Sequence, residues 1–136
     1  MTLILDTGFV VGLMVARDDH HRAAREWFAS VDEDLVTSPL AVTEMDHLLT
    51  ARGGARARDA LWANLDSGAF TVRWWADALS ETLAIARRHP FLGLTDASLV
   101  AVGSRIGTAR IATFDRHFRS MTTPDGDPLV LLPDDA

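Results

Sequence analysis

The amino-acid sequence predicts an α/β fold with a central, mainly parallel sheet flanked by helices. Short apolar runs, each suited to a buried strand, alternate with amphipathic segments of about 10–14 residues. This alternation is typical of strand–helix–strand units, whose strands lie parallel. The 136 residues contain no repeat, no low-complexity tract and no long linker. We therefore expect one domain spanning residues 1–136.

The first half of the chain predicts two strands and four helices. Ser38 and Pro39 form a helix start, because serine caps a helix and proline suits its first position. Gly53 and Gly54 end that helix. The strands are predicted at residues 3–5 and 35–37, and the helices at 9–16, 20–31, 40–51 and 56–65.

The second half predicts three strands and two longer helices. Pro90 stops one helix, and Gly107 ends the next. We expect the tail, residues 133–136, to be frayed. The strands are predicted at residues 70–73, 110–113 and 129–132, the helices at 76–88 and 95–106, and a helical turn at 116–119.

Composition excludes several classes of site. The absence of cysteine rules out zinc fingers, iron–sulfur clusters and thiol catalysis. The net charge of −6 argues against a protein that coats nucleic acid with a broad basic surface. Every basic residue is arginine, so no mechanism that needs lysine can operate. The first apolar run is too short to span a membrane and lacks a basic leader, so we expect a soluble, cytoplasmic protein without a membrane partner.

Two acidic residues follow predicted strands. Asp6 comes directly after the first strand, and Asp115 comes shortly after the strand that ends at Thr113. Ligands of parallel α/β sheets sit beyond the carboxyl ends of the strands, so both carboxylates should lie at one edge. The plainer alternatives are a helix N-cap for Asp6 and a turn residue for Asp115.

Two further acids lie on helices. Glu44 has Leu40 four residues before it and Leu48 four residues after it, which predicts an inward position with low exposure. A glutamate at the border of the apolar stripe, reaching water, is the alternative. Asp96 opens the helix at 95–106, where it could instead serve the helix dipole or a cap.

The four acids together predict a metal site. Clustered carboxylates repel one another, and divalent cations relieve that repulsion. Oxygen ligands favour Mg²⁺ or Mn²⁺ over zinc. No histidine set competes as a zinc site, since His20 and His21 are expected on the surface.

The surroundings of these acids resemble the PIN-domain family, in particular the VapC toxins of bacterial toxin–antitoxin pairs. The segment "LTDASLVAVGSRIGTARIATFDRHF", residues 94–118, is similar to the third and fourth family motifs, with Asp96, Thr113 and Asp115 in place. "LILDTG" resembles the first motif and "TSPLAVTE" the second, which contains Glu44. Gly8 departs from the family, which more often has a small polar residue there.

The resemblance implies a PIN-like fold and a Mg²⁺- or Mn²⁺-dependent ribonuclease that cuts single-stranded or loop RNA. It implies a VapB-like antitoxin whose tail fills the groove, and a homodimer. Metal held by the four acids would activate a water for attack on the phosphate. Thr113 would orient a carboxylate. The implied metal ligands are Asp6, Glu44, Asp96 and Asp115.

Several basic and aromatic residues are candidates for RNA contact. Arg116 and Arg119 stand beside the fourth acid and could clamp a flanking phosphate, or could belong to a solvated turn. Residues 51–58, "ARGGARAR", could contact RNA or a partner, or simply start a helix. Trp74 and Trp75 could stack on bases, or pack in the core or a dimer interface.

Other classes fit the sequence less well. Asp6-Thr7-Gly8 matches the aspartic protease tripeptide, but that class is all-β. A receiver domain needs a lysine, and a haloacid-dehalogenase-like phosphatase needs an acid at Gly8. A PIN-like module that binds RNA or a partner without cutting it remains the alternative function.

Overall fold

The computed structural model describes residues 1–136 and contains one five-stranded sheet. Its strands are ordered β3-β2-β1-β4-β5, and every neighbouring pair is parallel. The predicted α/β class is therefore confirmed. The strands are β1 (Thr2–Leu5), β2 (Asp34–Thr37), β3 (Thr71–Val72), β4 (Arg110–Ala112) and β5 (Val130–Leu132).

Strand β1 lies at the centre of the sheet. Ile4 pairs with Val36 of β2 on one side and with Ile111 of β4 on the other. The chain runs outward from β1 to β2 and β3, and then returns to place β4 against the free side of β1. The strand order thus reverses between β1 and β4, where parallel α/β sheets open a crevice for ligands.

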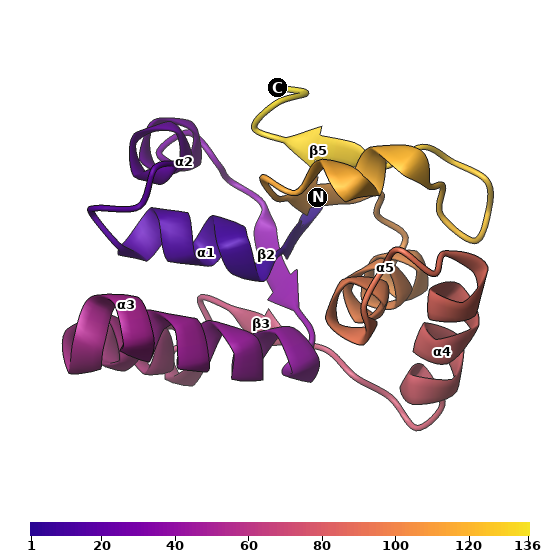
Figure 1. The fold of residues 1–136 in the computed structure, drawn as a ribbon, viewed down its shortest axis with the longest axis horizontal. Helices are drawn as coiled ribbons and strands as arrows, with labels where there is room; N and C mark the ends of the chain where they lie inside the picture. Colours follow the sequence, from indigo (N-terminus) through magenta and orange to yellow (C-terminus); the bar gives the residue numbers. More distant parts are fainter.

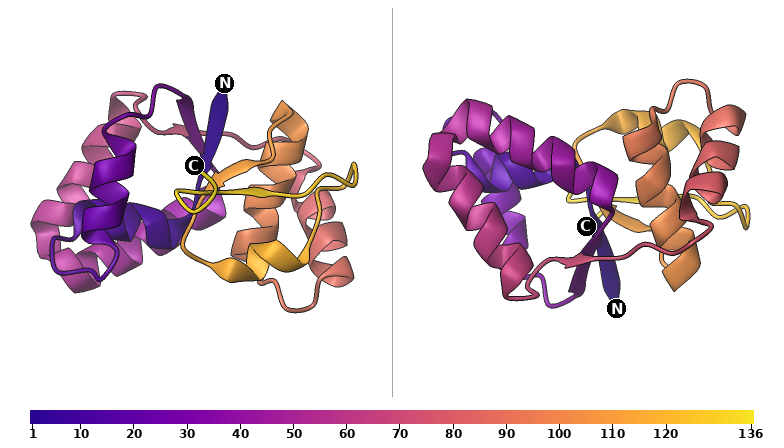
Figure 2. Two further views of the ribbon diagram at one scale, coloured as in Figure 1. Left: turned by 90° about the horizontal axis from the view of Figure 1, so that it is seen from above. Right: turned by 90° about the horizontal axis from the view of Figure 1, so that it is seen from below.

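Helices cover the sheet in two groups. Helices α1 (Thr7–Met14), α2 (His21–Phe28) and α3 (Pro39–Asp66) gather on one side of the strands, and α4 (Ala78–Arg88) and α5 (Leu94–Ile106) on the other (Figure 1). Both views in Figure 2 keep these groups apart. The crevice at the β1–β4 reversal is therefore flanked by α3 on one side and α5 on the other. No helix combines the length and the apolar character that crossing a membrane requires.

Helix α3 consists of the two helices that the sequence predicts at 40–51 and 56–65. They meet at Gly54, whose φ of 69° lies in the region that favours glycine. A Cβ on Gly53 would lie 2.5 Å from the Cβ of Ala57, so this turn also needs glycine there. Ser38 caps the first part by accepting from the Ala41 N–H at 3.1 Å, and Pro39 follows it as predicted.

A continuous apolar core joins the sheet to both helix groups. Side chains of β1, α1, α3 and α5 supply most of its fully buried members, including Leu5, Phe9, Leu49 and Leu99. Residues 97–103 of α5 are all buried, so this helix is enclosed rather than amphipathic. Its backbone packs closely at Gly103, where a Cβ would lie 2.9 Å from the carbonyl oxygen of Thr108, in the connection to β4, and 3.4 Å from the Ile4 side chain of β1.

The expectation of a frayed tail is wrong. The Asp135 carboxylate accepts from the Leu131 N–H at 2.7 Å and takes two hydrogen bonds from Arg119, at 2.6 and 2.7 Å. These bonds tie the tail to β5 and to the 3₁₀ turn η1 (Arg116–Ser120).

The parallel α/β sheet also rules out the aspartic protease interpretation, because that class is all-β.

Candidate active site

Asp6 sits where β1 ends and α1 begins, and it is 6% exposed. Its Oδ1 accepts from the Thr7 N–H at 2.8 Å, so it also caps α1. Its Oδ2 accepts from the Thr113 hydroxyl at 2.6 Å. Burial raises the pKa of Asp6 to about 7; the Thr113 hydrogen bond lowers that pKa, and the charges of Asp96 and Asp115 raise it.

Thr113, just beyond β4, links two of the acids. Its hydroxyl donates to Asp6 and accepts from the Asp115 N–H at 2.9 Å. This is the carboxylate contact that the resemblance implied for Thr113. The backbone supports it, because the Asp6 N–H donates to the Ala112 carbonyl at 3.0 Å. A single buried hydroxyl thus sets the positions of groups on β1 and beyond β4.

Asp96 and Asp115 complete the aspartate group. The pKa of Asp96 is raised to about 6: burial and the charges of Asp115 and Glu44 raise it, while the charge of His117 lowers it. Asp115 caps η1 by accepting from the His117 N–H at 2.9 Å, so the turn alternative describes part of its role.

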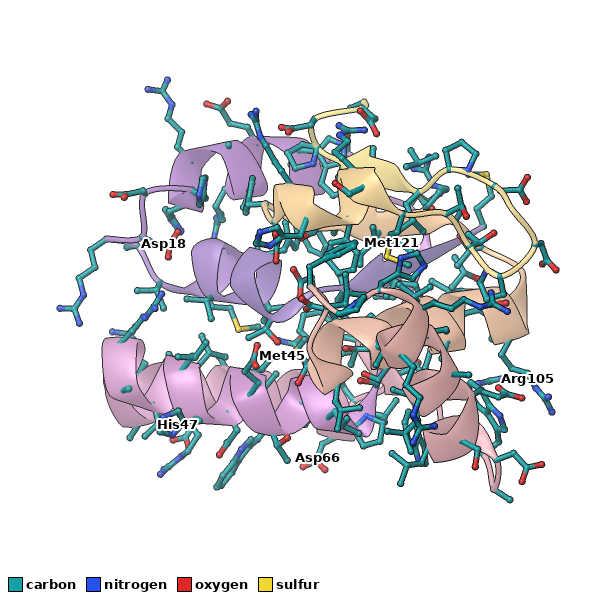
Figure 3. The ribbon with its side chains drawn as sticks, turned by 45° about the vertical axis from the view of Figure 1, so that its right-hand side comes forward. Asp18, Met45, His47, Asp66, Arg105 and Met121 are labelled. Atoms are coloured by element: carbon teal, nitrogen blue, oxygen red, sulfur yellow. The ribbon has the colours of Figure 1, made fainter.

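The expectation of low exposure for Glu44 is wrong. The buried stripe of the first part of α3 consists of Ala41, Met45 and Leu49, and Glu44 is exposed at its border. Figure 3 shows Met45 on the side of α3 that faces α1, and His47 on the side that faces away. Glu44 precedes Met45 by one position, which is about 100° around the helix. Its carboxylate therefore reaches the pocket rim.

All four acids line one pocket of about 550 Å³. They come from β1, α3, α5 and the segment after β4, which are the elements that meet at the β1–β4 reversal. The pocket continues past Leu48 to Asp18, His20, Arg52 and Phe114. Residues 51–58 are a sequence-based candidate for RNA or partner contact, and Arg52 of that segment lines this second end. The sequence did not place His20 or Phe114 there. The four-residue spacing of Glu44, Leu48 and Arg52 indicates their shared helix face.

A buried pair of serines holds the two helix groups together at the pocket. The Ser38 and Ser98 hydroxyls are 2.7 Å apart, and Ser98 donates to the Thr95 carbonyl at 2.6 Å. Because Ser98 uses its proton there, Ser38 is the donor between the two. This contact fixes the start of α3 against the first turn of α5, and so sets Glu44 relative to Asp96.

Arg116 and Arg119 lie outside the pocket lining. Arg119 is engaged by Asp135, and the Arg116 side chain is 83% exposed with Asp134 at 3.8 Å. Their contact with a phosphate stays a prediction.

Of Trp74 and Trp75, the pair considered for base stacking, Trp75 has partners within the chain. The Arg105 guanidinium lies over its ring at 5.3 Å, and its indole N–H donates to Glu81 at 3.0 Å.

The chemistry of the acids fits a hard divalent cation. None of the chain's ion pairs involves Asp6, Glu44 or Asp96, so these carboxylates have no internal cation. The side chains do not form a closed cage, since no three acidic or histidine groups converge on one point. Mg²⁺ rarely uses such cages; it keeps several waters and binds one or two carboxylates with substrate phosphates.

Comparisons with known proteins identify the family of this chain. The model of the PIN domain family matches residues 3–123. Ribonuclease VapC26 of Mycobacterium tuberculosis is 29% identical over 96% of this chain and 100% of its own length. Ribonuclease VapC29 of the same species is 30% identical over 98% of each chain.

A solved structure shares the fold at similar identity. The crystal structure of Mycobacterium tuberculosis VapC20, described as a sarcin-ricin loop cleaving toxin, superposes with a TM-score of 0.77 at 28% identity. The match covers 84% of this chain and 90% of VapC20. The family match spans most of the sequence, including all four acids. The chain belongs to the PIN-domain family and is a VapC-type member of it.

Proposed function

We propose that this protein is a metal-dependent endoribonuclease, the toxin of a VapBC-type toxin–antitoxin pair. One observation carries the proposal: carboxylates from four separate elements line one pocket, and three of them have no cationic partner. The ribonuclease names of the full-length relatives support the activity. RNA in single strands or loops is the proposed substrate, and VapC20, a relative by structure, is described as cleaving such a loop.

The chain's own residues prepare the site for a cation and a phosphate. Asp6, Glu44, Asp96 and Asp115 would hold Mg²⁺ or Mn²⁺, which when bound supplies an activated water and neutralises charge on the leaving oxygen. Thr113 holds the Asp6 carboxylate in one orientation through its 2.6 Å hydrogen bond. Because the pKa of Asp6 is raised to about 7, a bound cation would favour the charged form of this buried carboxylate at neutral pH.

The proposal includes a protein partner. An acidic pocket attracts a cationic segment, so we expect the antitoxin to place an arginine or lysine near Asp6 and Asp115. A homodimer and a cytoplasmic location belong to the same proposal. A complex with the pocket open and the antitoxin bound elsewhere would contradict the pocket-filling arrangement.

The activity is tested by sequencing RNA 5′ ends after brief expression of the protein. New ends should appear with the wild type and disappear with Asp6→Asn and with Asp96→Asn, both of which keep the side-chain shape. Asp66→Asn is the matched control, because Asp66 is exposed at the end of α3 and lies outside the pocket. Figure 3 shows its position.

Two outcomes would count against the nuclease. Identical 5′ ends in the wild type and in Asp6→Asn would separate the cleavage from this site. RNA binding by the purified wild type with Mn²⁺, but without cleavage of any RNA, would support the alternative of a non-catalytic PIN-like module.

A further inference from the structure

The pocket-facing side of α3 changes from acidic to basic along its length. Glu44, Leu48 and Arg52 are spaced by four residues, and all three line the pocket. The helix is regular until Gly54. A rise of 1.5 Å per residue therefore separates the Cα atoms of Glu44 and Arg52 by about 12 Å. Arg52 is the only arginine in the pocket lining, and the helix fixes its Cα position relative to Glu44.

The Arg52 guanidinium is open to a ligand. Its closest acid is Asp18, with Nη1 3.8 Å from Oδ2, which is beyond hydrogen-bond distance. The Arg52 side chain is 54% exposed, so solvent screens this pair. Arg17 donates to the Arg52 backbone carbonyl and brings a second cation to the same end. This end of the pocket thus favours an anion.

A flat aromatic surface stands beside Arg52. The His20 ring stacks on Phe114, with centroids 4.2 Å apart and planes 9° apart. Phe114 lies between Thr113 and Asp115 in the chain and stacks in turn on Phe9 at 5.7 Å. His20 is exposed and lines the pocket, so it presents a ring face to the solvent.

The backbone fixes this aromatic pair in place. The His20 N–H donates to Asp18 Oδ1 at 2.9 Å, and Asp18 lies in the loop that joins α1 to α2 (Figure 3). The pair packs against α1: a Cβ on Gly12 would be in ordinary van der Waals contact, 3.5 Å from the His20 Cβ and from the Phe114 ring. Asp18 therefore fixes the backbone of His20, and it lies near the Arg52 guanidinium without a hydrogen bond to it.

We propose that Arg52, His20 and Phe114 form a nucleotide-binding subsite at the second end of the pocket. Arg52 binds a phosphate of a single RNA strand, and the His20–Phe114 stack receives a neighbouring base. This inference rests on the proposed function, because the acids define where the strand would be cut. Stacking tolerates every base, so the subsite sets the path of the strand rather than its sequence.

Charge favours RNA over a cationic peptide at this end. Arg52 and Arg17 repel a basic antitoxin segment, which the four acids attract to the other end. A strand of RNA can bind at both ends, because one phosphate would contact Arg52 and another would contact the metal ion held by the acids. The two ends of one pocket would thus recognise the same polyanion by different means.

The experiment measures RNA binding in an Asp6→Asn background, in which the RNA stays intact. The probe is a fluorescein-labelled pool of random single-stranded RNA about 12 nucleotides long. Arg52→Gln should weaken binding and reduce the slope of log K against log salt by about 0.7, the value for one lost contact on a single strand. Arg87→Gln, on the exposed side of α4, is the matched control and should change neither quantity.

The aromatic pair is tested by exchange of the ring. His20→Ala should weaken binding on the order of tenfold, and His20→Phe should restore it, because either ring stacks on a base. Both variants keep the backbone bond to Asp18. Equal melting temperatures establish that the fold is intact.

The outcomes separate this inference from the proposed function. An unchanged salt slope in Arg52→Gln, with RNA cleavage by the wild type intact, would overturn the subsite alone. Arg52-dependent binding without any cleavage by the wild type would overturn the nuclease and leave the subsite. Weaker binding of a short acidic peptide by Arg52→Gln, with RNA binding unchanged, would assign this end to an acidic segment of a protein partner and overturn the inference.

Discussion

The Thr113 hydroxyl has more consequences than its size indicates. It donates to the most buried acid of the pocket, Asp6, and accepts from the backbone of Asp115. If the hydroxyl were removed, Asp6 Oδ2 and the Asp115 N–H would each lose a hydrogen bond, and Asp6 would keep only the bond from the Thr7 N–H. Its contribution therefore combines stability with the geometry of the carboxylates.

We predict that Thr113→Val lowers the free energy of unfolding by about 1–3 kcal/mol, because two buried polar groups lose their partner. RNA cleavage should fall by about 10–100-fold, as for other groups that orient metal ligands. Thr113→Ser keeps the hydroxyl and should retain most of both properties. Denaturant unfolding and cleavage rates measure them; equal cleavage by the Val and Ser variants would contradict the orienting role.

The raised pKa of Asp6 predicts the pH dependence of the metal-free protein. The folded value of about 7 exceeds the unfolded value of 3.8, so the folded state binds more protons between these pH values. The free energy of unfolding should therefore fall as pH rises from 4 through 7, by roughly 4 kcal/mol for this group at most. Binding of a cation would offset this loss.

Urea unfolding in EDTA at pH 5 and pH 8 measures this effect. Asp6→Asn cannot ionise and should lose most of the difference between the two pH values, whereas Asp66→Asn should keep it. If Asp6→Asn kept the full wild-type difference in unfolding free energy between pH 5 and pH 8, another group would be responsible for the pH dependence.

Single residues show where sequence reasoning succeeds at this site. Asp6, Asp96 and Asp115 could be placed together because strand ends and a helix start specify an edge of the sheet. The exposure of Glu44 could not be predicted in this way. Leu40 and Leu48 flank it at helical spacing, but packing against α1 buries the adjacent stripe that contains Met45. His20 was expected on the surface and is exposed, but only the path of the loop after α1 brings it to the pocket.

The 3₁₀ turn η1 and strand β5 are held together by one ion pair. Arg119 and Asp135 form two short hydrogen bonds, and the same carboxylate accepts from the Leu131 N–H. Arg119 lowers the pKa of Asp135, which favours the charged form of the pair. A residue expected to face RNA thus has a structural partner.

We predict that Arg119→Gln and Asp135→Asn each lower the melting temperature, and that the double variant adds little to either, because both remove the same contact. RNA cleavage should persist in both. Loss of cleavage in Arg119→Gln with an unchanged melting temperature would instead assign Arg119 to the phosphate, as the sequence prediction held.

Element boundaries show which local signals are sufficient. Ser38-Pro39 and Gly53-Gly54 correctly marked the start of α3 and its turn, because capping and positive φ depend on a few neighbouring atoms. Helix α1 begins at Thr7, two residues before its predicted start, because the Asp6 carboxylate caps it. The tail needed a contact with Arg119, sixteen positions away in sequence, which no local pattern contains.

The α/β class followed from the alternation of strands and helices, but the order of the strands did not. Placing β4 beside β1 requires the chain to cross the sheet, and that choice depends on packing between distant segments. The same reversal determines where the pocket opens. The sequence thus identified the acidic residues at the strand ends, and the topology of the sheet determined that they lie close together.

We predict that divalent cations stabilise the protein. Stabilisation by a ligand follows RT ln(1 + [L]/Kd), so Mn²⁺ at about a hundred times Kd adds on the order of 2.7 kcal/mol. The melting temperature should rise by roughly 5–10 °C for a domain of this size. Asp96→Asn should reduce this response, because it removes one carboxylate charge.

The test is a melting series in Mn²⁺, Mg²⁺ and EDTA at matched ionic strength. Asp66→Asn should respond like the wild type. Identical melting temperatures of the wild type in EDTA and in saturating Mn²⁺ would refute a metal site at the four acids.

The central position of β1 also has a consequence for biosynthesis. Asp6 is translated before its hydrogen-bond partner Thr113, which lies 107 positions later in the chain. Until β4 is translated and pairs with β1, the nascent chain lacks Thr113 and Asp115, and the Asp6 carboxylate lacks the hydroxyl that orients it. A protein proposed to cleave RNA would therefore complete its site only after β4 is made, and premature termination before β4 would release a fragment without the assembled site.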